Sequence, residues 1–291
     1  MICDWYQTTI NDDIQRVIRV FEDNLDVRLK MAQSGAMGYK NRGFLNNKYD
    51  VTLATVLWGG KTEKQSNPHA WATSDNAQGF MDLVRSFWGD SHTVTRIDVA
   101  EDMQGEGLFD ELSGRLLSLS KEMHVKTSIA GDWLTDDSPD GRTMYLGSPA
   151  SSCRARLYEK GKKTANELWI SKGFSPPDDF PMNWVRLELQ CRPARGVQRA
   201  IAHKTDLGDF WGFSKWSGKV AEDVFGLSVE KVPQVNWSVN SDDKVLSWVA
   251  RQYGKLFTRR HEELGSWEEV GKELGRFIES LNVPNRGRFG R

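Results

Sequence analysis

Cysteine is scarce in this sequence. Cys3, Cys153 and Cys191 are the three cysteines of a 291-residue chain, and no two of them have the Cys-x-x-Cys spacing. An odd number of cysteines at such separations predicts neither a disulfide framework nor a structural zinc site. Cys153 and Cys191 fall on the apolar sides of predicted strands, so we expect both to be small buried side chains.

Long apolar runs are also missing. No window contains the roughly eighteen consecutive apolar residues that a membrane-spanning helix needs. The first residues, M-I-C-D-W-Y-Q, have an acid where a secretory signal would have positive charge followed by a long apolar run. We therefore expect a cytoplasmic protein that has no membrane partner.

An excess of charge of one sign is absent as well. The chain has 39 Lys and Arg against 40 Asp and Glu, a net charge of −1, which argues against a globally basic nucleic-acid-binding protein. Basic residues are nevertheless clustered, because residues 154–163 contain five Lys or Arg against one Glu, and residues 286–291 contain three arginines. Such local patches suit DNA binding through one defined face, although ordinary surface charge produces them too.

The sequence around residues 55–62 excludes a nucleotide-binding loop. The tetrad G-G-K-T at residues 59–62 follows a predicted strand, but the phosphate-binding loop needs a glycine where Thr55 stands. The segment that follows is polar and contains Pro68, so a helix is not expected there. A turn is sufficient to explain the tetrad.

Apolar periodicity predicts an α+β fold. The chain alternates predicted strands with amphipathic helices. The strands are expected at residues 3–10, 49–58, 93–100, 124–129 and 183–191, with a hairpin over 143–163. The main helices are expected at residues 74–88, 108–123, 241–257 and 267–281, with a further helix after Asn11. We predict a mainly antiparallel sheet with helices packed on one face and its charged face open, followed by a smaller, mostly helical carboxyl-terminal part.

The chain divides, on this pattern, into residues 1–205 and residues 206–291. The change near residue 205 is from alternating strands to aromatic-rich and then helical segments. Twelve tryptophans are many for this length. Most of them should be core, and some could stack on unpaired bases.

The predicted hairpin contains a tyrosine among cations. Side chains alternate between the two faces of a strand, so Arg154, Arg156, Tyr158 and Lys160 should share the face opposite Cys153, Ala155 and Leu157. Neighbouring cations lower the cost of forming a phenolate and could hold a phosphate while the phenol oxygen attacks it. The alternative is an exposed edge strand that carries solvated charges.

Two further strands have the same kind of polar face. Arg96 and Asp98 alternate with apolar residues in one of them, and Arg186 and Glu188 do so in the other. If the three strands share a sheet, Asp98, Glu188 and Tyr158 could converge. The two acids could hold a hard divalent ion, Mg²⁺ or Mn²⁺, through oxygen ligands. A purely structural network of arginines and carboxylates remains the alternative.

Three segments, in this order, resemble the replication initiation factor family (Rep_trans type), which includes initiators of rolling-circle plasmids and of filamentous phages and prophages. They are R-I-D-V-A-E-D at 96–102, Y-L-G-S through R-L-Y-E-K-G-K at 145–162, and V-R-L-E-L-Q at 185–190. The resemblance covers roughly residues 3–200. It implies that residues 1–205 are a nicking–joining domain and that residues 206–291 form a helical carboxyl-terminal region.

The resemblance implies a reaction and its residues. Tyr158 would attack a phosphodiester at a replication origin and form a 5′-phosphotyrosyl link, leaving a 3′-OH for a polymerase. Asp98 and Glu188 match the acids of the motifs and would be ligands of Mg²⁺ or Mn²⁺, with Asp102 as a further candidate. Arg156 and Lys160 flank the tyrosine and could steady the phosphate. DNA contacts are expected from Arg154, Lys162, Lys163, Arg96 and Arg186.

Two features of the sequence depart from related patterns. Gln190 stands where a second glutamate is often found, which removes any role that needs a carboxylate there. None of the five histidines forms a His-x-His pair, so the histidine metal site of the commoner rolling-circle enzymes is absent. The second feature favours a metal held by carboxylates.

The expected partners follow from the same resemblance. They are origin DNA, single-stranded or in a hairpin at the nick, and the helicase and polymerase of a bacterial host, in whose cytoplasm the protein would act; a dimer is left open. A non-catalytic DNA-binding regulator and a metal-dependent nuclease that uses water are the alternative functions. A tyrosine recombinase would need more Arg and His around the tyrosine and a mainly helical fold.

Overall fold

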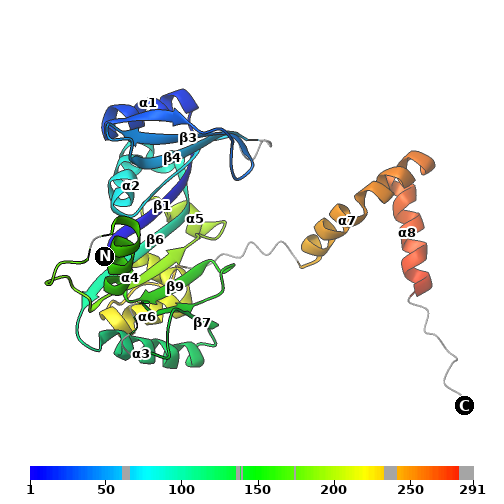
Figure 1. The fold of residues 1–291 in the computed structure, drawn as a ribbon. Coiled ribbons are helices and arrows are strands. Elements are labelled where there is room, and N and C mark those ends of the chain that lie inside the picture. The colour runs from blue at the N-terminus through cyan, green and yellow to red at the C-terminus, as the bar shows by residue number, and fades with distance from the viewer. Residues whose placement is uncertain (61–65, 136–137, 139, 174, 233–240, 282–291) are drawn as a thin grey trace, which may run out of the picture. The chain divides into compact units, whose positions relative to one another are not determined.

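The computed structural model describes residues 1–60, 66–135, 138, 140–173, 175–232 and 241–281. The chain forms two compact units, Met1–Val235 and Asn236–Arg291 (Figure 1). The boundary predicted at residue 205 falls inside the first unit, and the basic tail of residues 286–291 lies outside the described residues. Within the described ranges, no helix combines the length and apolar character needed to cross a membrane.

The first unit is built on a ten-stranded antiparallel sheet. In spatial order its strands are β2-β3-β4-β5-β1-β6-β10-β9-β8-β7. The strands are β1 (Ile2–Ile10), β2 (Val27–Met31), β3 (Tyr39–Asn47), β4 (Thr52–Gly60), β5 (His69–Thr73), β6 (His92–Gln104), β7 (Thr127–Ala130), β8 (Thr143–Leu146), β9 (Cys153–Tyr158) and β10 (Trp184–Cys191). The first strand of the chain therefore lies in the middle of the sheet, between β5 and β6.

Helices and short 3₁₀ segments connect these strands. They are α1 (Ile14–Leu25), α2 (Asp75–Trp88), η2 (Gly89–Ser91), α3 (Leu108–Glu122), α4 (Lys160–Lys172), α5 (Val197–Ile201), η3 (Gly208–Phe213) and α6 (Lys215–Phe225). The predicted α+β fold with a mainly antiparallel sheet is confirmed. The sequence did not predict β2, β3, β5 or α4, because their segments are short, polar or rich in glycine.

The hydrophobic core lies between one face of the sheet and the helices. Tyr6 and Ile10 of β1 are fully buried there, together with Phe21 of α1 and Phe80 of α2. Helix α1 begins at the cap residue Asp13, whose carboxylate accepts the Gln15 amide at 2.9 Å. This cap and the apolar stripe of the helix explain its position against the sheet.

The core continues past residue 205. Phe210, Trp211 and Phe213 of η3 are fully buried and join the same core cluster as β10. The aromatic run that suggested a second domain is therefore part of the hydrophobic core of the first unit.

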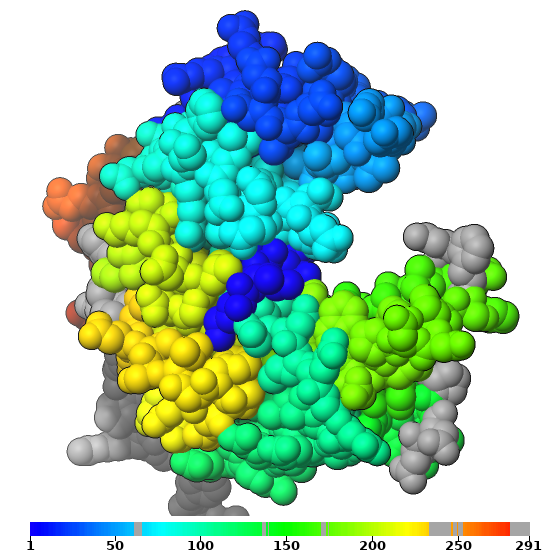
Figure 2. Space-filling view, turned by 90° about the vertical axis from the view of Figure 1, so that its left-hand side faces the viewer, coloured from blue at the N-terminus to red at the C-terminus, as the bar shows by residue number. Residues whose placement is uncertain are grey.

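Among the side chains of α4 that the structure describes, residues 160–169, none belongs to that core cluster. It follows Tyr158 directly and lies in front of the sheet in Figure 1. Figure 2 shows a side view in which the surface is hollowed between the cyan segment, around α2, and the green segment that includes α4. The dark blue amino-terminal segment lies at the bottom of this hollow.

The second unit contains a helical hairpin. Helices α7 (Ser241–Leu264) and α8 (Trp267–Leu281) are joined at Gly265, which has a φ of +80° that favours glycine. Arg260 of α7 donates through Nε to Glu273 of α8 at 2.9 Å. The predicted helical carboxyl-terminal part is confirmed.

Candidate active site

Three neighbouring strands, β6, β10 and β9, bring the predicted strand residues onto one face of the sheet. In the β9–β10 pairing, Tyr158 is opposite Arg186 and Arg156 is opposite Glu188. In the β10–β6 pairing, Arg186 is opposite Asp102. The intervening residues, such as Leu157 and Leu187, are fully buried in the core cluster. The period of two therefore places the polar side chains on the opposite face, as the alternation predicted.

Each predicted acid is bound by an arginine. Arg96 donates through Nε to Asp98 Oδ1 at 2.8 Å, and Arg156 donates to Glu188 Oε2 at 2.6 Å. Arg186 holds Asp102 with two hydrogen bonds of 2.6 Å, from Nε and Nη2. Without a bound ligand, the site is thus a row of arginine–carboxylate pairs.

Asp98 and Glu188 are the most deeply placed of these acids, with exposures of 2% and 4%. Burial raises the pKa of Asp98, and the hydrogen bond from Arg96 offsets only part of that effect. Burial also raises the pKa of Glu188, against the attraction of Arg156 and with a contribution from the negative charge of Asp98. Both carboxylates therefore gain from any additional cation that approaches this face.

Asp102 belongs to a separate cluster. Four residues along β6 separate it from Asp98, a distance of roughly 13 Å in an extended strand, so one ion does not touch both acids in this arrangement. Burial raises the pKa of Asp102, but the hydrogen bonds from Arg186 outweigh it, and the pKa lies below its ordinary value. Arg186 also binds Asp4 of β1, with 2.7 Å between Nη1 and Oδ1.

Asp4 is a site residue that the sequence did not predict. Its negative charge raises the pKa of both Glu188 and Tyr158, so Asp4 acts electrostatically on these two site residues. The register of β1 against β6 shifts between Cys3 and Trp5, so Asp4 lies in a bulge. Only the acid in an otherwise aromatic strand, C-D-W-Y, could have indicated this position.

The donor set fits a divalent cation that is shared with a substrate. Among the described residues, no group of three or more His, Cys, Asp or Glu side chains could hold a metal ion. Mg²⁺, however, is usually bound by one or two carboxylates together with water and substrate phosphates, and not by a cage of protein ligands. Asp98 and Glu188 are both buried, and the negative charge of Asp98 raises the pKa of Glu188. This pair of carboxylates matches that requirement.

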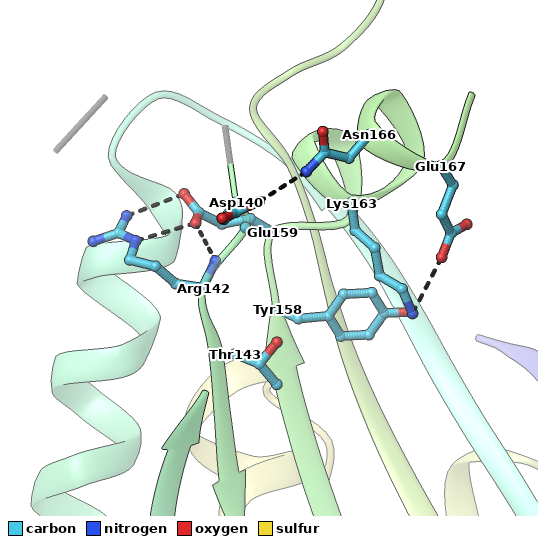
Figure 3. Close-up of a pocket in the computed structure, with 9 residues that line it drawn as sticks. Asp140, Arg142, Thr143, Tyr158, Glu159, Lys163, Asn166 and Glu167 are labelled. Atoms are coloured by element: carbon cyan, nitrogen blue, oxygen red, sulfur yellow. Dashed lines mark hydrogen bonds and ion pairs between the residues drawn. The ribbon is translucent and has the colours of Figure 1, made fainter. Parts of the chain in front are cut away.

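Tyr158 lines a cavity at the end of β9. The cavity has a volume of about 550 Å³, and Figure 3 shows the residues that surround it. They come from the segment before β8 and the first residue of that strand, from the end of β9, and from α4 and its cap residue: Asp140, Gly141, Arg142, Thr143, Tyr158, Glu159, Lys163, Asn166 and Glu167. Tyr158 is 3% exposed, and its side chain borders this cavity.

The wall of this cavity is fixed by Glu159. Its carboxylate accepts the backbone amide of Arg142 at 2.7 Å and the side-chain Nε of the same residue at 3.1 Å (Figure 3). Arg142 also reaches Asp110 of α3, with 2.7 Å between Nη1 and Oδ1. These bonds tie the start of β8 to the start of α4 on either side of Tyr158.

The predicted effect of the cations on Tyr158 is only partly realised. Arg156 lies over the phenol ring, 4.6 Å from its centroid, and Arg186 is opposite in the register. Both lower the pKa, but burial and the charge of Glu188 outweigh them and raise the pKa of Tyr158 to about 12. The cations therefore reduce the cost of forming the phenolate, as the sequence predicted, but they do not offset the effect of burial.

The lysines after Tyr158 are not arranged as the strand pattern predicted. The strand ends at Tyr158 and α4 begins at Lys160, whose Nζ lies 5.6 Å from the centroid of the Trp184 ring. Lys163 instead lies over Tyr158, with Nζ 5.3 Å from the ring centroid. Lys162 pairs with Glu159 at 3.2 Å. The strand pattern predicted Lys160 beside the phenol, but the residues after Glu159 follow the helical period of 3.6, and Lys163 lies there instead.

Arg154 lines a second, smaller pocket on the same face. Its guanidinium lies over Tyr145 of β8, 4.0 Å from the ring centroid. The pocket has a volume of about 140 Å³ and contains three arginines against one acid. Its residues are Arg96, Tyr145, Arg154, Arg156, Glu188 and Gln190. This surplus of positive charge suits a backbone phosphate next to the one that Tyr158 would attack.

The raised pKa of Tyr158 gives a measurable titration. We expect its phenol to remain protonated at pH 10, where an exposed tyrosine is half ionised, and to titrate near pH 12. Because the folded state disfavours the phenolate, the contribution of this group to stability is complete below pH 10 and is lost as the pH rises toward 12. Carbon-13 NMR of labelled tyrosine, assigned with Tyr158→Phe, measures the titration. A midpoint near 10 would contradict the burial that we describe.

A comparison with known proteins finds a family match in the part of the chain that contains this site. Residues 92–201 match the model of the replication initiation factor family, and the matched part spans the strands that carry Asp98, Tyr158 and Glu188. The resemblance predicted from the sequence is thereby confirmed over these residues. No curated protein sequence matches the chain significantly.

One solved structure that resembles the chain is a rolling circle replication initiator protein from Geobacillus stearothermophilus. The two sequences are 18% identical, the alignment covers 79% of this chain and 98% of that chain, and the TM-score is 0.48.

Proposed function

We propose that this protein initiates rolling-circle replication by nicking and rejoining one DNA strand at an origin, with Tyr158 as the nucleophile. The observation that supports this most is the register of β9 and β10, which puts Tyr158, Arg156, Arg186 and Glu188 on one polar face beside a cavity. A DNA-binding regulator would need the arginines but not a buried tyrosine that lies near a buried carboxylate.

The chemistry is an exchange of one phosphoester for another. The Tyr158 phenol oxygen attacks the phosphorus and loses its proton, the bond from phosphorus to the 3′ oxygen breaks, and that oxygen takes up a proton on leaving as the 3′-OH. The 5′ phosphate remains on the tyrosine. Because the number of phosphoester bonds is unchanged, the reverse attack by a 3′-OH can rejoin the strand without an energy source.

The arginine–carboxylate pairs would serve as the resting state of the site. A DNA phosphate competes with Glu188 for Arg156 and with Asp102 for Arg186, since arginine binds phosphate and carboxylate with the same planar geometry. Release of Glu188 from Arg156, together with the same competition for Arg96 beside Asp98, would leave both carboxylates ready to hold Mg²⁺ or Mn²⁺. The bound ion would neutralise the charge of the phosphate.

The same proposal covers the partners and the place of action. The substrate would be an origin that is single-stranded or extruded as a hairpin at the nick, and the free 3′-OH would be passed to the helicase and polymerase of a bacterial host. The reaction would take place in the cytoplasm of that host, on a plasmid, phage or prophage. Lys160 would act on the Arg186 side of the tyrosine, where its Nζ lies near Trp184.

Covalent capture tests this function. The protein is incubated with supercoiled DNA of its own replicon, or with single-stranded oligonucleotides of candidate origins, in the presence of Mn²⁺, and then denatured. We expect a protein–DNA adduct that mass spectrometry places on Tyr158 and that a chelator prevents. Cleavage without an adduct would replace the proposal by a water-using nuclease. Tight binding with neither cleavage nor adduct, across several divalent ions, would replace it by a regulator.

A further inference from the structure

Arg96 joins the candidate active site to an aromatic surface. The residue holds Asp98 through Nε, and its guanidinium carbon also lies 3.9 Å from the centroid of the Trp5 ring. Trp5 of β1 is directly opposite Asp98 in the register of β1 and β6. The arginine is therefore shared between a carboxylate of the site and a partly exposed indole on the next strand.

Hydrogen bonds extend this contact along β1 and onto the next strand, β5. The Trp5 indole donates to Gln7 Oε1 at 3.2 Å, and the Gln7 amide is 2.7 Å from His69 Nε2. The other ring nitrogen of His69 is 3.0 Å from the hydroxyl of Thr9. Burial lowers the pKa of His69 to about 4, so the ring is neutral at physiological pH and keeps both bonds. The indole of Trp5 is thus held in a fixed orientation.

Trp71 of β5 completes the surface. It is opposite Gln7 in the register and lies beside His69, with 6.2 Å between the ring centroids. We call Trp5, Gln7, His69, Trp71 and Arg96 the aromatic strip. The strip crosses β6, β1 and β5 in the direction away from β10 and β9.

The aromatic strip shares the face of the catalytic residues. Tyr6 and Thr8, which alternate with Trp5 and Gln7 along β1, are fully buried, and Ala70 and Ala72 of β5 belong to the core cluster. Trp5 and Trp71 remain partly exposed on the other side of the sheet. In Figure 2 the amino-terminal segment lies at the bottom of the hollow between the cyan and green segments.

We propose that the aromatic strip binds unpaired bases of the DNA strand that Tyr158 cuts, with Trp5 and Trp71 as stacking partners. Tryptophan stacks on any unpaired base, whereas the base faces of a duplex are already covered by their neighbours. Arg96 supplies the positive charge that such a path along a backbone requires. This inference rests on the proposed function and adds the route of the strand beyond the nick.

The dimensions of the sheet agree with a strand that occupies both places. Four strand spacings separate β9 from β5, a distance of roughly 19 Å. A strand of several nucleotides spans this length. The bases on the strip would then hold the phosphate beside Tyr158 in register, and the stacking would require an origin that is melted over this stretch.

The test compares DNA with and without bases. All measurements use Tyr158→Phe protein in a chelator, so that no strand is cut, and record the affinity by fluorescence anisotropy. The probes are a labelled single-stranded oligonucleotide of about 20 nucleotides with mixed sequence and the same backbone built from abasic residues. We expect the oligonucleotide with bases to bind at least about tenfold more tightly than the abasic one.

Substitutions locate the source of this preference. Trp5→Leu and Trp71→Leu should each lower the preference for bases by about fivefold to a hundredfold, the loss expected when one base loses its stacking partner. Trp5→Phe should retain most of it. Trp58→Leu on β4 is the matched control, because Trp58 packs toward the core on the opposite face, and it should leave the preference unchanged.

The proposal is overturned if the leucine variants keep the preference for bases, or if affinity for the abasic probe falls equally. It is also overturned if Trp5→Leu leaves DNA binding intact and changes the mass of the protein in solution, which would assign the face to a second copy of the chain. Should Trp5→Leu fail to fold, Trp71→Leu and Trp5→Phe decide. Absence of an adduct on Tyr158 would refute the nicking function without altering these binding ratios.

Discussion

Replacement of Tyr158 by phenylalanine is expected to abolish the covalent adduct and to lower strand cleavage by about a thousandfold or more. The change removes the attacking oxygen and nothing else, because the ring stays between Arg156 and Lys163. Loss of a nucleophile lowers a rate by several orders of magnitude, while binding that depends on other groups persists. The variant should therefore bind single-stranded DNA as tightly as the unaltered protein. Gel analysis of the denatured reaction measures both products.

Tyr145 offers a matched control for this experiment. It lies on β8, opposite Arg156 in the register, and has its own arginine, Arg154, over the ring. Tyr145→Phe should form the adduct at a rate within a few-fold of the unaltered protein. An adduct that survives in Tyr158→Phe and disappears in Tyr145→Phe would transfer the role of nucleophile to the neighbouring strand.

Replacement of Arg186 by alanine is expected to lower the free energy of unfolding by about 3 kcal/mol. The guanidinium, with 7% of the side chain exposed, binds Asp4 on β1 and Asp102 on β6. Its removal leaves two carboxylates close together without their cation. Such a loss costs about 3–5 kcal/mol for a fully buried pair. We expect the lower end because the two carboxylates keep some contact with solvent.

Chemical denaturation followed by circular dichroism measures this loss. Arg16→Ala is the control, since Arg16 pairs with Asp12 at 3.5 Å on the surface of α1 and most of its side chain is exposed. That substitution should change the stability by no more than about 1 kcal/mol. An equal, small effect of both substitutions would mean that the Arg186 cluster is as solvated as an ordinary surface pair.

The shared face of the site residues was predictable from the sequence because strands alternate with a period of two. Tyr158, Arg156 and Glu188 were expected on one face, and the register of β9 and β10 places them there. The identity of the lysine beside the phenol was not predictable in this way. The alternation was extended through Lys160, whereas the chain turns into a helix after Glu159 and brings Lys163 over the ring.

The contribution of β1 to the site was not predictable from the sequence, for a different reason. Asp4 and Trp5 reach the site only because β1 inserts between β5 and β6, and no local pattern states which strands are neighbours. The bulge at Asp4 further shifts the alternation by one residue. The sequence likewise did not predict that residues 210–213 belong to the core of the first unit. An aromatic cluster predicts burial, but it does not indicate which surface the cluster packs against.

The strand order also has a consequence for the time at which the protein becomes active. Tyr158 precedes Arg186 and Glu188 in the sequence, so a growing chain contains the tyrosine before these two residues are made. Strand β10, which carries them, lies between β6 and β9 in the sheet. Pairings between distant segments form late in folding. A chain that is truncated or stalled before residue 191 would have the nucleophile on an unpaired strand edge without its arginine and its carboxylate. Under the proposed nicking function, host DNA would thus be protected from cleavage by unfinished copies of the protein.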